Sequence, residues 1–367
     1  MRNSLLELDP YADALLILRC PNLQQVRAVE EEVEDVEWNL PGEVESKEDK
    51  ESKTSTELDE ITSLKPFDED GNPQEIMFRV SAKHLRLASP FFDKMLRGGF
   101  QEAKPNNEGL LEFRAQDWNV RALLILLDII HGHHRQVPKE LDLDTIAHIA
   151  LLVDYYDCLE IVDVFSDHWL TNLAEWEIYE WSEVHRNSAF HFDKAEVLML
   201  FSAWIFRKQK EFKNLVMSAI YETSGPIETE LPIPSHILDK IEEQRIGLLE
   251  ELFAQLYTLQ FDLFQGNTGC SYECSCRLLG FLMRQMRDKN LPMTKPEPPF
   301  IGFSVNALIL FLEHVETPHW FSGKHKLDSC QLEKRIDLDE EVMDRLAPGL
   351  SLEEFGLIPT HPDNDWA

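Results

Sequence analysis

The sequence predicts an α+β fold, in which a small mixed sheet flanked by helices is followed by an all-α C-terminal region. Apolar residues alternate over 76–80 and then recur every three or four positions over 85–95, the pattern of a strand that leads into a helix. A second apolar run at 12–18 precedes an acidic segment at about 26–72, and beyond residue 173 the pattern is almost wholly helical. A chain of 367 residues has room for two domains of ordinary size.

Local signals define the N-terminal strands and the first helix. The run ADALLIL at 12–18 has Asp13 at its start and is interpreted as a buried strand. In FRVSAKHLRLASPFFDKML, residues 78–96, the pair Ser89-Pro90 marks the start of a helix. The hydroxyl accepts from unpaired backbone N–H groups, and proline suits the first turn.

The acidic segment at about 26–72 has a different composition from its surroundings. Glu, Asp, Ser and Lys dominate it, so it buries too little apolar surface to offset the entropy of ordering. We therefore predict a disordered insertion. A solvated acidic loop is the simplest interpretation, and an acidic docking segment for a basic partner is the alternative.

The remaining elements are predicted from periodicity and from Gly or Pro breaks. A strand is expected at 110–113, followed by a helix over 118–130 that ends at Gly132 and Pro138. The further helices are predicted at 143–158, 160–173, 194–222, 235–264, 274–291 and 305–315. The predicted organisation is an N-terminal domain at 1–175, a helical domain at 176–345 and a tail at 346–367.

Composition excludes several classes of partner. The net charge of -32 argues against non-specific binding to nucleic acid or anionic membranes, which requires a positive field. No apolar run reaches the roughly 18 residues of a membrane span, and the six cysteines are sparse. We expect a soluble, intracellular protein with reduced thiols, and both the nucleus and the cytoplasm are compatible with this.

A set of residues at 10–173 carries a resemblance to a known family. The family pattern is an Asp-led strand, then FxVxxxxLxxxSPxF, and later a helix of the type represented by DYYDC. The matching residues are Asp13, Phe78, Val80, Leu85, Ser89, Pro90, Phe92 and Gly132. The region resembles the BTB/POZ domain, and the region beyond it resembles the helical extension of many fungal BTB-containing proteins.

The resemblance implies a module for protein contact. BTB domains pair with themselves, with other BTB domains, or with cullin-type ubiquitin ligase scaffolds. The expected function is therefore a non-catalytic protein–protein interaction scaffold, and the alternative is a substrate adaptor of a cullin-type ligase. The chain departs from the family at Ala82, where dimeric members carry a basic residue. It departs again at 122–124, where cullin adaptors often carry a hydrophobic-x-Glu triplet.

Possible chemistry is confined to two clusters. His131, His133 and His134 lie at a predicted helix end, where a protonated imidazole interacts favourably with the helix dipole, and solvated capping is the expected role. The second cluster is Cys270, Cys274 and Cys276. Buried structural thiols are the expected interpretation; zinc, with a further ligand from His314 or Cys330, and redox sensing are the alternatives.

Catalytic motifs are absent from the sequence. There is no G-x-S-x-G, no phosphate loop with GK[ST], no H-E-x-x-H and no G-x-G-x-x-G. We expect neither an enzyme nor a cofactor. The remaining alternative is a metal- or thiol-dependent enzyme in the C-terminal half, built around Cys274 or the histidines.

Overall fold

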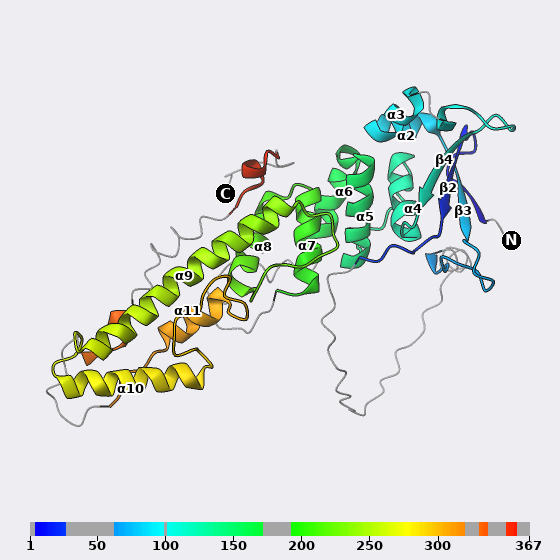
Figure 1. The fold of residues 1–367 in the computed structure, drawn as a ribbon. Coiled ribbons are helices and arrows are strands. Elements are labelled where there is room, and N and C mark those ends of the chain that lie inside the picture. The colour runs from blue at the N-terminus through cyan, green and yellow to red at the C-terminus, as the bar shows by residue number, and fades with distance from the viewer. Residues whose placement is uncertain are drawn as a thin grey trace, which may run out of the picture. The chain divides into compact units, whose positions relative to one another are not determined.

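The computed structural model describes residues 4–26, 62–98, 101–171, 192–319, 330–336 and 350–357. This part of the chain is an α+β protein with one small mixed sheet and predominantly helical structure elsewhere, as the sequence predicts (Figure 1). It forms two compact units. The first contains the described residues up to 171 together with 197–208 and 229–232, and the second contains the other described residues.

The sheet of the first unit has the order β1-β3-β2-β4 among the described strands. These strands are β1 (Ser4–Glu7), β2 (Ala14–Arg19), β3 (Glu75–Val80) and β4 (Leu111–Gln116). β2 pairs antiparallel with β3 and parallel with β4, whereas β1 pairs parallel with β3. Alternate side chains bury one face, including Leu16, Phe78 and Phe113. The strand β1 was not predicted, because its four residues show no alternation.

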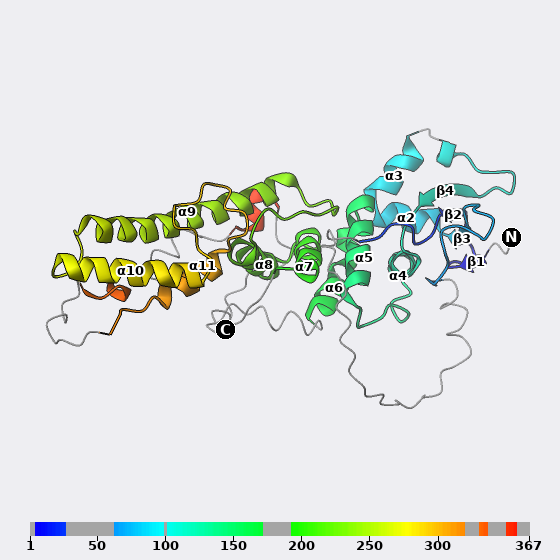
Figure 2. The same ribbon diagram turned by 60° about the horizontal axis from the view of Figure 1, so that its bottom comes forward.

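Helices complete the first unit. They are α2 (Ala82–Ala88), α3 (Pro90–Arg97), α4 (Val120–Ile130), α5 (Leu143–Tyr156) and α6 (Leu159–Thr171), and most of α7 (Lys194–Ile205). Figures 1 and 2 show α4, α5 and α6 side by side next to the sheet, and each contacts the other two. The helix α4 is apolar around most of its circumference, since nine of its residues are buried.

Residues 197–208 belong to the first unit, although the predicted boundary at 175 placed them in the helical domain. The physical reason is visible at Lys208, which is buried directly after α7. Its ammonium group lies 2.8 Å from a carboxylate oxygen of Asp163 and 2.5 Å from one of Asp167, both on α6. A buried lysine requires such partners, and they fix this segment to the N-terminal unit.

Part of the predicted insertion is ordered. The side chain of Asn22, in a left-handed conformation, donates to the carbonyls of Thr62 at 3.1 Å and Leu64 at 2.9 Å, and accepts from the N–H of Val120 at 2.8 Å. Phe67 and Pro73 form a β-bridge. Residues 62–72 therefore belong to the fold, contrary to the predicted limits of 26–72. The rest of the predicted insertion, 27–61, lies outside the described residues.

The second unit is helical in its described part. Its helices are α8 (Gln209–Glu222), α9 (Ser235–Gln265), α10 (Tyr272–Asp288) and α11 (Val305–Glu313), with short 3-10 turns η5 (Glu333–Arg335) and η6 (Leu352–Phe355). The helix α9 contacts α8, α10 and α11, so it forms the spine of this unit (Figure 2). Its 31 residues span about 46 Å at the usual rise of an α-helix.

The predicted tail also contributes to the core. Leu350 and Leu352 are buried, and the N–H of Leu352 donates to the side chain of Gln209 on α8 at 3.0 Å. Phe355 packs edge-on against Phe212. Residues 350–357 are therefore part of the helical unit, because their apolar side chains find a site on α8.

No helix in the described ranges combines the length and the apolar character that crossing a bilayer requires.

Candidate functional site

Asp13, which directly precedes β2, caps the helix α2. Its carboxylate accepts from the backbone N–H of Ala82 at 2.7 Å, at the first residue of α2. The hydroxyl of the N-cap residue Ser81 makes no capping bond, so Asp13 supplies the acceptor in its place. Ala82 has no basic side chain for this carboxylate, and the carboxylate binds the backbone N–H of Ala82 instead.

Ser89 joins two elements of the first unit. Its hydroxyl accepts from the N–H of Phe92 at 3.3 Å, which caps α3, as the Ser89-Pro90 pair predicted. The same hydroxyl donates to the carbonyl of Tyr156 at the end of α5, at 2.5 Å. Ser89 is fully buried. It therefore fixes α3 against the C-terminal end of α5.

The three histidines point to different partners. His131 accepts the N–H of Ser81 at Nε2 and donates from Nδ1 to the carbonyl of Leu127, at 3.0 and 2.8 Å. Burial lowers the pKa of His131, and the contact with Ser81 requires an unprotonated Nε2. His133 bonds to Asp128, and His134 packs against Phe165. His131 does cap α4, but as a neutral, half-buried ring, so the expected charged and solvated role is wrong for it.

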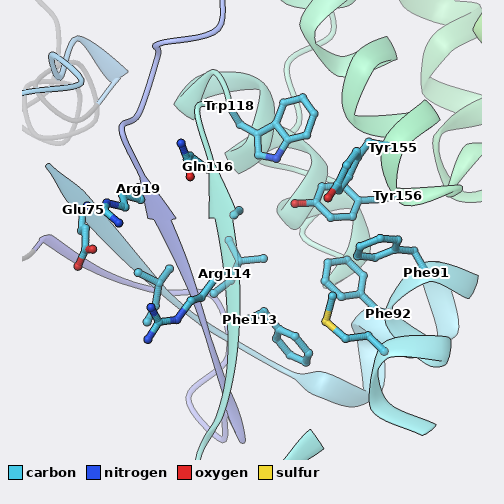
Figure 3. Close-up of a pocket in the computed structure, with 14 residues that line it drawn as sticks. Arg19, Glu75, Phe91, Phe92, Phe113, Arg114, Gln116, Trp118, Tyr155 and Tyr156 are labelled. Carbon is cyan, nitrogen blue, oxygen red and sulfur yellow. The ribbon is translucent and has the colours of Figure 1, made fainter. Parts of the chain in front are cut away.

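An aromatic cleft lies between the sheet and helices α3 and α5 (Figure 3). Its volume is about 380 Å³. Six aromatic side chains line it, with ring centroids 4.9 to 6.2 Å apart along the chain of contacts: Phe91, Phe92, Phe113, Trp118, Tyr155 and Tyr156. We call this site the aromatic cleft.

The aromatic cleft has a closed floor and an accessible mouth. Phe92, Phe113 and Tyr156 are buried, whereas Tyr155 is 52% exposed. The Trp118 side chain hydrogen-bonds the Tyr156 hydroxyl, and burial raises the pKa of that hydroxyl. The floor is therefore buried and neutral, and the exposed aromatic ring at the mouth is available for contact.

The strand β4 forms one wall of the cleft and an edge of the sheet among the described strands. Asp117, just after β4, donates its N–H to the carbonyl of Arg19 at 2.9 Å. Because alternate residues of a strand bond to the same neighbour, the odd-numbered residues of β4 face β2 and the even-numbered ones face away. The 3-10 turn η1 (Gln101–Ala103) contacts part of β4, and the rest of this edge places backbone donors and acceptors next to the aromatic cleft.

The cysteines form a second cluster, with a different membership from the predicted one. The sulfur atoms of Cys270, Cys274 and Cys330 all lie within 4.8 Å of one another. Cys276 lies outside the cluster and hydrogen-bonds Tyr272. The helix α10 begins at Tyr272, so Cys270 folds back toward Cys274 while Cys276 faces another side. Burial raises the pKa of the Cys274 thiol to about 11.

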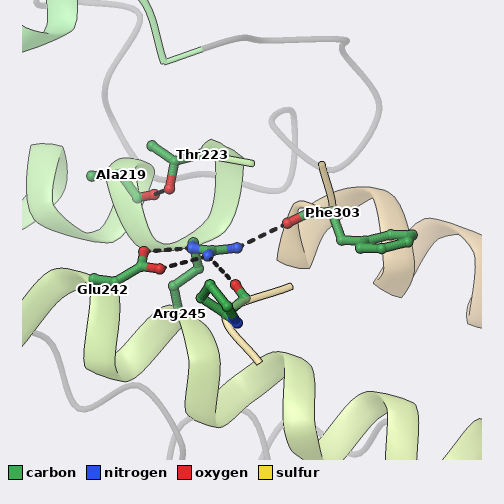
Figure 4. A network of polar contacts seen from close by, with 6 residues as sticks. Ala219, Thr223, Glu242, Arg245 and Phe303 are labelled. Atoms are coloured by element: carbon green, nitrogen blue, oxygen red, sulfur yellow. Dashed lines mark hydrogen bonds and ion pairs between the residues drawn. The ribbon is translucent and has the colours of Figure 1, made fainter. Parts of the chain in front are cut away.

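The fully buried Arg245 lies in the core of the helical unit. The guanidinium group of Arg245, which is fully buried, binds the carboxylate of Glu242 through two bonds of 2.7 Å (Figure 4). It also donates to the carbonyls of Pro299 at 2.7 Å and Phe303 at 3.0 Å. Four of its five N–H groups have partners within the unit, so this network holds the loop before α11 against α9 and has a structural role.

The triplet at 122–124, where the resemblance would place cullin contacts, is mostly buried. Ala122 and Leu123 are 0% and 1% exposed, and Leu124 is half-buried. A charge placed at 122 or 123 would disturb the core of the first unit, so substitutions at these two positions cannot test a binding surface.

Comparison with known proteins adds no family. No protein-family model matches the sequence, and a search of curated proteins gave no match.

The sequence predicts most strands and helices of the first unit but not the aromatic cleft. The motif residues lie at the junctions of sheet and helices, but the half-buried Trp118 and the exposed Tyr155 of the cleft were not predicted as site residues. A usable signal was present in the pair Tyr155-Tyr156 at the end of an apolar helix, because neighbouring side chains of a helix point about 100° apart and so reach different surroundings.

Proposed function

We propose that this chain is a non-catalytic interaction protein, with a BTB/POZ-like N-terminal unit that docks a segment of another protein in the aromatic cleft. The observation that carries the proposal is an aromatic cleft with an exposed ring beside an edge strand. Large aromatic side chains dominate the energetics of interfaces, and an open strand edge pairs with an extended peptide. The two features side by side suit one ligand, an extended segment with an apolar anchor.

The resemblance to the BTB/POZ domain is supported by the positions of the motif residues. The strands β2, β3 and β4 occur at the three places along the chain where the sequence predicts strands. Asp13 and Ser89 each satisfy backbone groups at a helix start, which gives both motif residues a physical role. These observations agree with the family pattern without depending on any homologue.

The charge of the chain favours a basic partner. With a net charge of -32, the protein attracts a positively charged surface at long range and repels an acidic one. Arg114 and Gln116, both exposed, line the cleft next to the edge and supply local polar contacts. The partners that the resemblance implies are a second copy, another BTB domain or a cullin-type scaffold.

A pair of tyrosine variants tests the proposal. Tyr155→Ala removes the exposed ring at the mouth, while Tyr11→Ala removes a 91% exposed tyrosine of the same unit that lies outside the cleft. Affinity purification from the native host, with quantitative mass spectrometry, should show proteins that the wild type and Tyr11→Ala retain. Their recovery should fall about tenfold or more with Tyr155→Ala, as expected for truncation of an aromatic anchor.

Two further measurements keep the outcome clear. Equal melting temperatures for the three proteins establish that Tyr155→Ala is folded. Light scattering over a concentration series tells whether the occupant is a second copy of the chain. The same partners at the same recovery with all three proteins would overturn the cleft as the docking site.

A further inference from the structure

Three thiols from two distant parts of the sequence meet at the start of α10. Cys270 and Cys274 lie around the helix N-terminus, and Cys330 comes from a segment more than fifty residues further on. Cys274 and Cys330 are 2% and 0% exposed, whereas Cys270 is exposed. The cluster is therefore closed on one side and reaches the surface on the other.

The loop before α10 has the shape that brings the thiols together. Gly269 has a φ of +106°, and a Cβ atom at this position would lie 3.2 Å from the sulfur of Cys274 and from the N–H nitrogen of Ser275. Only glycine combines that conformation with so close an approach. Ser271 then caps the helix by accepting from the N–H of Cys274 at 3.2 Å. The backbone thus turns sharply over Cys274 and places Cys270 next to it.

Two features near the cluster favour negative charge on sulfur and act against the burial that raises the pKa of the Cys274 thiol. The backbone N–H of Cys270 donates to the sulfur of Cys274, and the N-terminus of α10 carries partial positive charge. Hydrogen bonds from backbone N–H groups are typical outer-shell support for metal-bound sulfur. A tetrahedral zinc site with bonds of about 2.3 Å separates its sulfurs by about 3.8 Å, which lies within the 4.8 Å limit seen here.

We propose that Cys270, Cys274 and Cys330 bind one Zn²⁺ ion. The three thiols lose their protons on binding, and the ion is held by three thiolates, the donors that soft divalent metals prefer. The exposed side at Cys270 leaves the fourth position to water or to another donor from solution. The ion would join the segment at Cys330 to the loop before α10, and so act as a clip inside the helical unit.

Elemental analysis of the full-length protein tests the site. The protein is produced with zinc in the medium, purified under reducing conditions and passed over a desalting column. We expect about one zinc ion per chain in the wild type. Cys274→Ser and Cys330→Ser should lose it, whereas Cys276→Ser should keep it. Cys276 is a matched control because it lies on the same helix, two residues from a proposed ligand, and points away.

A second variant and a second readout protect the test against misfolding. Cys270 is exposed, so Cys270→Ser should fold even if substitution of a buried cysteine does not. Cobalt(II) substituted for zinc should give sulfur-to-metal charge-transfer absorption that is strong in Cys276→Ser and weak in Cys270→Ser. A chelator should lower the melting temperature of the wild type and leave that of Cys270→Ser unchanged.

Three results would overturn the proposal. One is wild-type protein without metal in which all six thiols titrate. Another is an intact mass two hydrogens lower than calculated, which would indicate a disulfide between two of the three cysteines. The last is equal loss of zinc from Cys276→Ser and Cys270→Ser.

Discussion

Two kinds of buried polar junction can be compared between the units: short side chains that cap helix starts in the N-terminal unit, and a buried arginine that holds a loop in the helical unit. In the N-terminal unit, Asp13 and Ser89 use short side chains to accept from backbone N–H groups at helix starts. In the helical unit, one long cation, Arg245, donates to Glu242 and to two backbone carbonyls of a loop (Figure 4).

The difference matters because removing the partner of a buried charge destabilises a protein far more than removing the cap of a backbone N–H group. Loss of a cap leaves one backbone donor that water can reach by a small movement, at a cost of about 0.5–2 kcal/mol. Loss of one partner of a buried ion pair leaves an uncompensated charge, at a cost of about 3–5 kcal/mol. Arg245 should therefore be more sensitive to substitution than Asp13 or Ser89. The N-terminal unit also holds a buried cation, Lys208, which pairs with Asp163 and Asp167.

Arg245→Met should have the largest effect. It leaves the carboxylate of Glu242 and two carbonyls without their donor, so we expect a loss of about 3–5 kcal/mol in the free energy of unfolding. Urea unfolding followed by circular dichroism measures it. The control Arg287→Met removes an arginine whose side chain is 68% exposed, and it should change stability by less than about 0.5 kcal/mol. Similar losses for both would contradict the contrast.

Ser89→Ala should have an intermediate effect in the N-terminal unit. It removes the cap of α3 and also strands the buried carbonyl of Tyr156, so we expect a loss of about 2–3 kcal/mol. Ser304→Ala is a matched control, because Ser304 caps α11 through the N–H of Ala307 at 3.2 Å. The loss at Ser89 should exceed that at Ser304 by about 1 kcal/mol. Equal losses would show that the bond to Tyr156 contributes little.

The smallest effect should be a dependence on pH at His131. Burial lowers its pKa below the ordinary value of about 6.5, so the unfolded chain takes up the proton first as the pH falls. The stabilisation is present above about pH 6.5 and is lost as the pH falls toward the lowered pKa of the folded state. On acidification from pH 7.5 to 5.5, the melting temperature should fall more in the wild type than in His131→Gln.

His134→Gln is the control for this dependence. His134 is exposed and its ring packs against that of Phe165, so its replacement should preserve the wild-type response to pH. A response of the same size in the wild type and in His131→Gln would show that His131 does not govern it.

The fold was predictable where its signals are local. Ser89-Pro90 marks the start of α3 and Gly132 the end of α4, because capping and a positive φ depend on neighbouring residues alone. The strand β1 is too short to show a period. Helix α7 is apolar on nearly all sides, so its sequence has no polar face that would indicate which of the two units it packs against.

The candidate sites were less predictable, because their members are far apart in the sequence. The aromatic cleft combines residues before α4 and at the ends of α3 and α5, and no spacing connects them. The cysteine cluster depends on where α10 begins: at Tyr272, Cys270 joins Cys274 and Cys276 is excluded. Cys330 enters only through tertiary packing.

The clamp formed by Asn22 has a consequence for how this protein tolerates change. One amide holds the chain on both sides of residues 27–61, since Asn22 itself precedes them and its side chain binds Thr62 and Leu64 just after them. With the ends fixed in this way, each doubling of the length between them costs only about 0.6 kcal/mol. We therefore expect that residues 27–61 can be replaced by a longer, shorter or unrelated segment while the strands of the sheet keep their register.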